Sequence, residues 1–310
     1  MDAELKDRVK ILFPDLAEDI CQQFIRVCSL SDYVRQSALQ HSDIVGELIG
    51  SGDLLRQYEN ETLSVKVKQS LKQPIQVSEF DSKLRRIRRR EMVRIIFRDF
   101  SRISDLVETT RDLSDLAESS IDTALNYHYQ NNCSKLGVPT SHEGVAQKMC
   151  VLALGKLGAK ELNLSSDIDL IFLYDKPGFA VSESGREISN QEFFLRTSRQ
   201  LIASLDNRTE EGFVFRVDMR LRPYGESSAL ILHWAAMEKY FLEQGREWER
   251  YAFIKARAVG GDLELGSEFL SWLKPFVYRK HLDYGAIESL REMKRLIDRQ
   301  VEIKEIKEDL

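Results

Sequence analysis

The sequence predicts an α+β protein in which a helical N-terminal region is followed by an α/β core and then by further helices. Three observations predict this class. From Met1 to about Asn131, apolar residues recur three and four positions apart, as on the buried face of a helix, and strand signals are nearly absent. Short apolar runs follow between residues 149 and 221. Helical periodicity returns from about Ala235.

Length and charge restrict the class of protein further. The 310 residues correspond to about two domains at roughly 150 residues each. Lys and Arg total 45 against 50 Asp and Glu, so the net charge is −5, and nucleic-acid binding over a broad surface is not expected. We expect a helical domain over residues 1–134, an α/β core over 135–234 and a helical continuation over 235–310.

The cysteines and the N-terminus indicate a reduced, cytoplasmic protein. Four scattered cysteines include no Cys-x-x-Cys pair, and we expect them to be free, partly buried thiols: Cys21, Cys28, Cys133 and Cys150. Acidic residues stand at positions 2, 4 and 7, where a secretory signal would carry basic residues. There is no apolar stretch of the roughly 18 residues that a membrane span needs. The five histidines lie apart, so neither a zinc site nor a histidine-based catalytic pair is indicated.

One helix of the N-terminal region can be predicted in detail. Its apolar stripe has the spacing i, i+3, i+4, i+7 and consists of Val93, Ile96, Phe97 and Phe100. Six arginines occupy much of the remaining surface: Arg85, Arg86, Arg89, Arg90, Arg94 and Arg98. The favoured interpretation is a solvated helix face that pairs with acidic neighbours, and the alternative is a wall that faces an anion. Pro74 is expected to mark a turn before this helix, because proline disfavours a helical residue before it.

The α/β core is expected to begin after a polar linker at residues 135–144. Three strands are predicted, at residues 149–154, 168–174 and 213–221. A helix over residues 190–205 connects the second strand to the third, because its apolar residues have helical spacing. The last helix of the chain is expected over residues 286–307.

A glycine turn follows the first strand. Gly155 and Gly158 let the backbone approach a ligand closely, and Lys156 lies between them. The segment is not a Walker phosphate loop, because no Ser or Thr follows the lysine, and the chain lacks the Gly-x-Gly-x-x-Gly of a dinucleotide-binding fold. The turn is nevertheless suited to a phosphate.

Two aspartates stand at the head of the second strand. Side chains alternate along a strand, so Asp167 and Asp169 point to the same face. Such close like charges repel each other, and a divalent metal ion or an exposed edge is the natural explanation. Ser165 and Ser166 offer hydroxyls beside the acids. Phosphate and metal could therefore meet here, although Asp-x-Asp alone is also typical of an acidic strand end in water.

The third predicted strand supplies another carboxylate. Its apolar face contains alternate residues, and its other face carries four charged side chains: Arg216, Asp218, Arg220 and Arg222. Simple solvent exposure is the alternative. Three carboxylates can hold two metal ions about 3.5 to 4 Å apart, an arrangement that clamps the attacking and leaving oxygens of a displacement at phosphorus. The arginines would neutralise phosphate oxygens.

A further basic and aromatic cluster spans residues 245–262. Trp248, Tyr251 and Ile254 have helical spacing, and the favoured interpretation is a packed amphipathic helix whose basic side chains reach toward water. Alternatively, Lys255 and Arg257 reach the phosphates.

Three segments carry a resemblance to a known family. They are GKLGAKELNLSSDIDLIF, GFVFRVDMRLRPYGES and EWERYAFIKARAVGGD, in this order. With them the chain resembles the bifunctional glutamine synthetase adenylyltransferase/adenylyl-removing enzymes, which are polymerase-beta-like nucleotidyltransferases. The stretch RRREMVRI at residues 88–95 resembles the helical segment that precedes the catalytic domain in this family. The resemblance extends from about residue 85 to 295, is weaker before that, and implies a polymerase-beta-like fold for the core.

The family contains two homologous halves, of which the first removes AMP from a tyrosine of glutamine synthetase and the second attaches it. The motif sequences RPYGES and WERYA, together with the helical region after Met1, resemble the first half. The resemblance then implies phosphorolysis, in which inorganic phosphate attacks the adenylyl-tyrosine and ADP leaves. It implies three metal-binding acids, Asp167, Asp169 and Asp218, with two Mg²⁺ ions or alternatively Mn²⁺. The phosphate turn would contain Gly155, Gly158 and Ser166.

The implied partners are adenylylated glutamine synthetase, ADP or ATP, inorganic phosphate and a PII-type signal protein, with no nucleic acid and no membrane. The chain ends at Leu310, before segments that the family contains, so we expect a truncated first half with reduced or lost activity. Three alternatives remain open. These are adenylyl transfer from ATP, a nucleotidyltransferase with a small-molecule or RNA acceptor, and a module that docks on glutamine synthetase without turnover.

Overall fold

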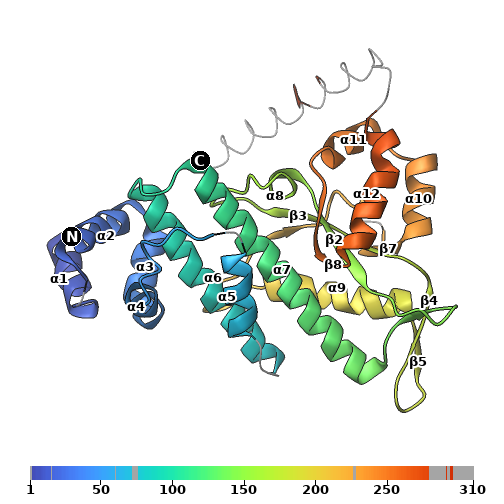
Figure 1. Ribbon diagram of the computed structural model, residues 1–310, viewed down its shortest axis with the longest axis horizontal. Coiled ribbons are helices and arrows are strands. Elements are labelled where there is room, and N and C mark those ends of the chain that lie inside the picture. Colours follow the sequence, from blue (N-terminus) through green and yellow to red (C-terminus); the bar gives the residue numbers. More distant parts are fainter. Residues whose placement is uncertain are drawn as a thin grey trace, which may run out of the picture.

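The computed structural model describes residues 2–14, 16–59, 61–71, 76–225, 228–278, 291, 294 and 295. Helices and strands are both present, which confirms the α+β class (Figure 1). The predicted turn at Pro74 and nearly all of the predicted helix at 286–307 lie outside the described residues. None of the described helices is long and apolar enough to cross a membrane.

The N-terminal region is helical, as its periodicity predicts. Its helices are α1 (Asp2–Leu12), α2 (Glu18–Leu30), α3 (Asp32–Gln40), α4 (Ser42–Gly50), α5 (Thr62–Ser70), α6 (Val77–Phe100) and α7 (Leu106–Leu136). Local capping fixes where some of them begin. The Asp105 carboxylate accepts a hydrogen bond of 2.7 Å from the Glu108 amide at the start of α7, so that an otherwise unpaired helix N–H is satisfied.

The strands of the core form two sheets. They are β1 (Thr140–Ser141), β2 (Met149–Ala153), β3 (Ile168–Tyr174), β4 (Gly178–Val181), β5 (Glu187–Ser189), β6 (Val217–Asp218), β7 (Ile231–His233) and β8 (Arg257–Gly261). The small sheet has the order β1-β4-β5. The larger sheet has the order β6-β3-β2-β8, and β7 also pairs with β3. β2 is antiparallel to both neighbours, whereas β6 and β7 run parallel to β3.

Helices cover both faces of the larger sheet. One of them is α7, and the helices after β2 are α8 (Gly155–Gly158), α9 (Asn190–Asp206), α10 (Trp234–Glu243), α11 (Glu247–Phe253) and α12 (Leu263–Val277). Val151 of β2 packs in a cluster with α7 and α9, while its neighbour Leu152 packs in a second cluster with α10 and α12. Figure 1 shows α7 and α10 on opposite sides of β2. Strands buried on both faces have continuous apolar sequences, which explains why β2 and β3 were predictable. The first cluster extends to Val9 in α1, and the division at residues 134 and 135 stays a prediction.

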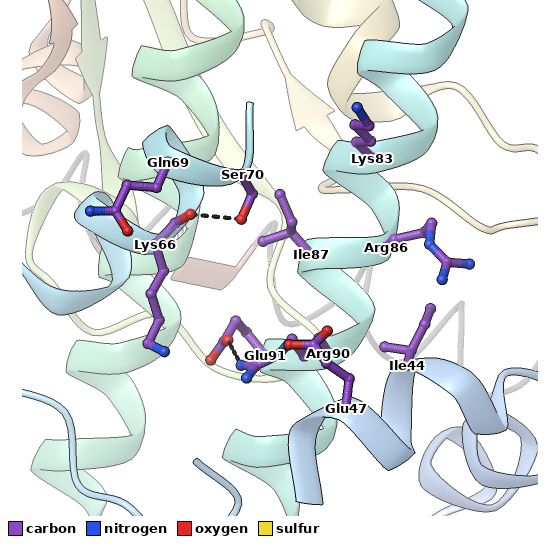
Figure 2. Close-up of a pocket in the computed structure, with 10 residues that line it drawn as sticks. All are labelled: Ile44, Glu47, Lys66, Gln69, Ser70, Lys83, Arg86, Ile87, Arg90 and Glu91. Carbon is purple, nitrogen blue, oxygen red and sulfur yellow. Dashed lines mark hydrogen bonds and ion pairs between the residues drawn. The ribbon is translucent and has the colours of Figure 1, made fainter. Parts of the chain in front are cut away.

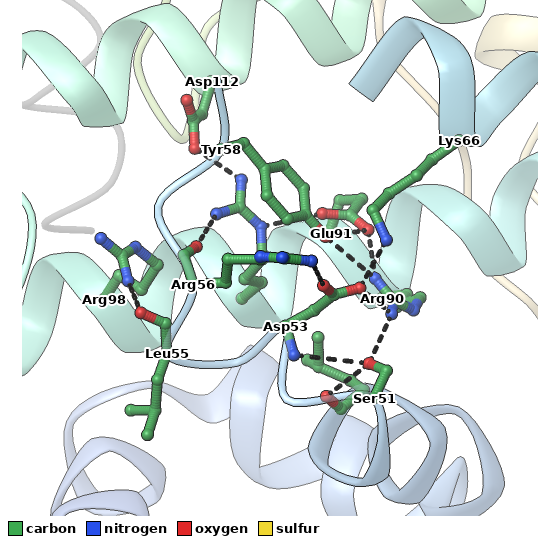
Figure 3. A network of polar contacts seen from close by, with 12 residues as sticks. Ser51, Asp53, Leu55, Arg56, Tyr58, Lys66, Arg90, Glu91, Arg98 and Asp112 are labelled. Carbon is green, nitrogen blue, oxygen red and sulfur yellow. Dashed lines mark hydrogen bonds and ion pairs between the residues drawn. The ribbon is translucent and has the colours of Figure 1, made fainter. Parts of the chain in front are cut away.

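The arginines of α6 pair with acids, as the favoured interpretation expects, but the predicted solvated face is wrong. Arg94 is fully buried and bonds to Glu91 at 2.9 Å and to Asp112 at 2.5 Å. Its guanidinium also lies 3.7 Å from the centre of the Tyr58 ring. Figure 3 shows the surrounding network, in which Arg90 and Arg98 of α6 bond to residues 51–58 and Asp112 of α7 lies close by. Carboxylates from distant parts of the chain make this burial possible, because a buried charge must be paired.

Three other arginines of α6 hold the segment that leads into β6. Arg85 donates to the Asn207 carbonyl at 3.2 Å, and Arg89 donates to the Glu211 carbonyl at 2.8 Å. The Arg88 guanidinium lies 5.1 Å from the centre of the Phe213 ring. The alternative interpretation, a wall that faces an anion, therefore does not describe these side chains, because they bind the protein's own backbone and rings.

Two predicted elements differ from the structure. The strand expected at 213–221 is limited to β6, because only Val217 and Asp218 find a partner in β3. The helix expected within 245–262 ends at Phe253, and the chain then enters β8, which pairs with β2. The prediction of a helix at 190–205 is confirmed by α9. The described cysteines are free, three of them buried, also as expected.

Candidate active site

The site lies where β3 and β6 begin their parallel pairing. Asp169 and Asp218 are register partners, and so are the residues before them, Ile168 and Val217. The Ile168 amide donates a hydrogen bond of 2.9 Å to the Arg216 carbonyl, which fixes this register. Two carboxylates that are distant in the sequence thus come from neighbouring positions at one sheet edge. Asp167 stands two residues before Asp169 on the same side of the chain.

Two arginines bind two of these acids. Arg216 forms a short ion pair with Asp167, and it also donates to the Ser165 carbonyl at 2.6 Å. Arg220 bonds to Asp218 through its side chain at 2.8 Å and through its backbone amide, also at 2.8 Å. The Arg216 and Asp167 side chains are both about half exposed. This pair is accessible to solvent and contributes little to stability, whereas Arg220 is exposed and Asp218 is mostly buried.

The electrostatics of the three acids differ. Burial, and then the nearby charges of Asp218 and Asp167, raise the pKa of Asp169 above its ordinary value. Hydrogen bonds from Arg220 lower the pKa of Asp218, with a smaller contribution from the charge of Arg222. Asp169 is therefore the acid whose negative charge is least compensated. A cation beside it would favour its ionised form.

The glycine turn packs directly against Asp169. The turn is the single helical turn α8, and Gly155 at its start has φ +56°. A Cβ on Gly155 would lie 2.7 Å from the nearer Asp169 carboxylate oxygen. A Cβ on Gly158 would lie 2.2 Å from the Lys255 carbonyl oxygen. Both glycines are thus needed for close packing, and Lys156 between them is exposed.

The two serines bind within their own loop. The Ser166 hydroxyl donates to the Asn163 side chain at 2.6 Å, and the Ser165 amide donates to the same oxygen at 3.2 Å. Their hydroxyls therefore bond within the turn before β3, and their contact with a ligand of the site stays a prediction. Sequence reasoning missed Asn163, although an Asn before two serines is a common turn signal.

The remaining predicted phosphate ligands bond to other groups of the protein. Arg222 donates to the Met219 carbonyl at 2.6 Å, and its charge still acts on Asp218. Lys255 pairs with Glu161 at 2.6 Å. Arg257 forms a two-point ion pair with Glu118 of α7 and donates to two backbone carbonyls of α8. Most of its donors are therefore used within the protein, and its contact with a phosphate stays a prediction.

The donor set at the sheet edge suits a hard divalent cation, because Mg²⁺ prefers carboxylate oxygens. Among the residues that the structure describes, no three His, Cys, Asp or Glu side chains converge closely enough to hold a metal ion. In this structure Arg216 and Arg220 bond to two of the three carboxylates. The residues fit the metal by chemistry and register, provided that these exposed ion pairs open.

A hollow with a volume of about 430 Å³ lies between α4, α5 and α6, away from the sheet edge (Figure 2). Four cations line it, and each already bonds to a carboxylate. Lys66 pairs with Asp53, Arg86 with Asp43, Lys83 with Glu79, and Arg90 with both Asp53 and Glu91. This balance of charge gives the hollow no evident preference for an anion, and the sheet edge is the stronger candidate.

The fold and the site define an α+β protein with a carboxylate and arginine cluster at the edge of a mixed sheet, beside a glycine turn. The model of one protein family, glutamate-ammonia ligase adenylyltransferase, matches residues 21–272. The chain belongs to this family.

Curated relatives agree with this assignment. A bifunctional glutamine synthetase adenylyltransferase/adenylyl-removing enzyme of Pseudomonas syringae pv. tomato is 50% identical over 93% of this chain and 29% of the relative. Proteins of the same name from Pseudomonas aeruginosa and Hahella chejuensis are 46% and 44% identical, over 94% and 98% of this chain. The chain spans about 30% of the length of these relatives.

Proposed function

We propose that this chain carries a polymerase-beta-like nucleotidyltransferase site that acts on glutamine synthetase and removes AMP from its adenylyl-tyrosine by phosphorolysis. The observation that carries the proposal is the pairing of Asp169 with Asp218 at the sheet edge that Asp167 adjoins. Relatives whose names include both adenylyl transfer and adenylyl removal support the substrate. The motif sequences RPYGES and WERYA support the assignment to the adenylyl-removing half.

In this proposal an oxygen of inorganic phosphate forms a bond to the phosphorus of AMP-O-tyrosine. The bond from phosphorus to the tyrosine oxygen breaks, so that ADP is formed and the tyrosine oxygen is the leaving group. The tyrosine oxygen then takes up a proton. Asp167, Asp169 and Asp218 would hold up to two Mg²⁺ or Mn²⁺ ions, which when bound neutralise the phosphate charges and the departing tyrosinate. The protein's other contribution is position: Gly155 keeps the turn in contact with Asp169.

The arginines would change partners during this reaction. Arg216 and Arg220 pair with Asp167 and Asp218 in the structure. Cation binding by the acids would release both guanidinium groups, and their planar donors are well suited to phosphate oxygens. No histidine is required as a base, since inorganic phosphate is already an anion at neutral pH. Docking of a PII-type signal protein would belong to regulation, and no residue of this chain is assigned to it.

The test combines the full chain with adenylylated glutamine synthetase, Mg²⁺ and phosphate, and measures ADP. A parallel reaction supplies unmodified synthetase and ATP, and measures transferred AMP. ADP formation that requires phosphate supports the proposal, and D169N supplies the inactive control. AMP transfer alone would support the other activity in the relatives' names. Binding to the synthetase without either product would mean a docking module instead.

A further inference from the structure

The glycine turn is connected to α7, a helix of the N-terminal region, through the side chain of Arg257. Arg257, at the start of β8, donates to the Gly158 carbonyl at 3.2 Å and to the Leu157 carbonyl at 3.1 Å. The same guanidinium bonds to both carboxylate oxygens of Glu118, at 3.0 and 2.5 Å. It therefore connects the last carbonyls of α8 to α7.

Further contacts between α7 and the turn surround this ion pair. Lys160, which follows α8 with φ +60°, reaches Asp115 at 3.4 Å. The Leu162 amide donates to the Ser114 hydroxyl at 3.3 Å. Ser114, Asp115 and Glu118 lie within one helical turn of α7, so a short stretch of this helix contacts the chain from Leu157 to Leu162.

The opposite end of α8 is the end that meets the acids. Because α8 has only four residues, a displacement of its last carbonyls also displaces its first residue. Gly155 packs closely against Asp169, since a Cβ built on Gly155 would lie 2.7 Å from the Asp169 carboxylate. The position of the turn relative to Asp169 therefore depends on what fixes the Gly158 end.

The Glu118 and Arg257 pair has the properties of such a fixing contact. Both side chains are mostly buried, with 20% and 31% exposed. Four of the five guanidinium N–H groups are used if each bond takes one hydrogen. Removal of the Glu118 charge would leave a partly buried guanidinium free to turn away from the carbonyls.

We infer that Glu118, acting through Arg257, is a positioning residue for the nucleotidyl-transfer site: the ion pair holds the glycine turn at its working distance from Asp169. This inference rests on the proposed function for its effect on turnover, whereas its effect on the turn itself does not. It also gives the N-terminal region a part in the chemistry of the core.

The test uses Glu118→Gln, Glu118→Asp and Arg257→Lys in the full chain, with two measurements. Hydrogen exchange of the segment 155–162 reports on the turn directly, and we expect at least about tenfold faster exchange in E118Q, because the segment loses an anchor. The steady-state phosphorolysis rate reports on the site. We expect kcat to fall about tenfold while KM for adenylylated synthetase changes less than twofold, because a misplaced catalytic turn mainly affects the transition state. E118D, which keeps the charge, should recover part of both effects.

Glu108→Gln is the matched control. Glu108 lies on the same helix and pairs with an arginine, Arg98, at 2.7 Å, but the partner belongs to α6 and not to the site. E108Q should lower the free energy of unfolding at least as much as E118Q, while exchange of 155–162 and kcat stay unchanged in the folded protein. Equal effects of both variants on exchange and kcat would overturn the inference, and so would wild-type behaviour of E118Q. Faster exchange in E118Q without activity in the unaltered chain would instead refute the proposed function and leave the anchoring of the turn supported.

Discussion

Asp169 and Asp218 stand opposite each other on the parallel strands β3 and β6, and Gly155 approaches the Asp169 carboxylate from α8. The two acids are thus held by backbone pairing, and the third, Asp167, by the chain that enters β3. Substitution of one of these aspartates changes the charge of the site without changing the backbone pairing of β3 with β6. Asp169 is central to the group because burial and both other acids raise its pKa.

We therefore expect Asp169→Asn to abolish the proposed phosphorolysis, with a decrease in kcat of at least about a thousandfold, and to leave the fold intact. The substitution keeps shape and removes the charge that a metal ion requires, and it also removes repulsion from Asp218 and Asp167. The free energy of unfolding should be unchanged or slightly higher. The measurements are ADP release and urea unfolding. Residual Mg²⁺-dependent turnover above a tenth of the unaltered rate would place the chemistry elsewhere.

A second prediction concerns competition between Arg220 and a metal ion for Asp218. If the guanidinium occupies the carboxylate until a cation displaces it, Arg220→Gln should lower the Kd for Mg²⁺ by up to about fivefold, the equivalent of one exposed ion pair. Turnover should nevertheless fall, because the same arginine is expected to bind phosphate. Isothermal titration with Mg²⁺ alone gives the Kd. Arg208→Gln is the control, since Arg208 is exposed and lies near the Phe213 ring. Weaker Mg²⁺ binding by R220Q would contradict the competition.

The buried ion pairs of α6 predict a large effect on stability. Arg94 is fully buried between Glu91 and Asp112. Arg94→Met removes the positive charge and leaves two buried carboxylates uncompensated, which should lower the free energy of unfolding by about 3 to 5 kcal/mol. Arg35→Met is the comparison, because Arg35 pairs with an exposed Asp32, and its effect should stay below about 1 kcal/mol. Urea denaturation followed by circular dichroism measures both. Equal losses in the two variants would show that the network contributes no more than surface pairs.

The strands and helices that the sequence predicts well are those whose pattern reflects burial. β2 and β3 have continuous apolar sequences because helices cover both of their faces, and α9 is buried on one face only, which gives helical spacing. The strand β8 carries no such signal. Its sequence, RAVGG, contains two glycines, and its extended state depends on pairing with β2. A contact between distant segments has no local signature.

The site follows the same division. Its acids and glycines occur in compact motifs, so Asp167, Asp169 and Gly155 could be proposed from the sequence. The partners of the arginines could not. Arg94 and Arg257 look like surface residues in a count of charges, and they become partly or fully buried because Asp112 and Glu118 approach from α7. Only the tertiary structure pairs these groups, and for Glu118 the sequence offers no more than an acidic face on a helix.

A further prediction is a pH dependence of stability that arises from His128. This side chain is buried, and burial lowers its pKa from 6.5 to about 4. The folded state therefore resists protonation more than the unfolded state does. The contribution to stability is fully present above pH 6.5 and is lost as the pH falls toward 4, where the loss reaches about 3 kcal/mol.

His128→Gln should remove this dependence, because glutamine does not titrate. Its amide can still donate to the Ser204 hydroxyl, which lies 2.7 Å from the His128 ring nitrogen. Burial raises the pKa of Asp81, which accepts a hydrogen bond from the same Ser204, and this acid acts in the opposite direction. The comparison of H128Q with the unaltered chain isolates the histidine. Unfolding free energies at pH 7, 6, 5 and 4 give the difference. If the free energy of unfolding falls equally in both proteins as the pH is lowered, other groups cause the loss of stability in acid.

The last prediction concerns Gly158, where α8 lies against the neighbouring strands. A Cβ at this position would stand 2.2 Å from the Lys255 carbonyl oxygen and 2.7 Å from that of Ala153. Both atoms belong to backbone that leads into or out of β2 and β8, so the clash can be relieved only by a shift of α8. Gly158→Ala should lower the free energy of unfolding by about 1 to 3 kcal/mol, as overpacking does. It should also reduce kcat in protein that remains folded, because the same shift moves Gly155 away from Asp169.

Gly50→Ala is the control, since a Cβ at Gly50 meets nothing within 4 Å, and its helical position favours alanine by up to about 1 kcal/mol. Urea unfolding and ADP release measure the two effects, and a G158A protein with unaltered stability and rate would mean that the turn is free to move without consequence.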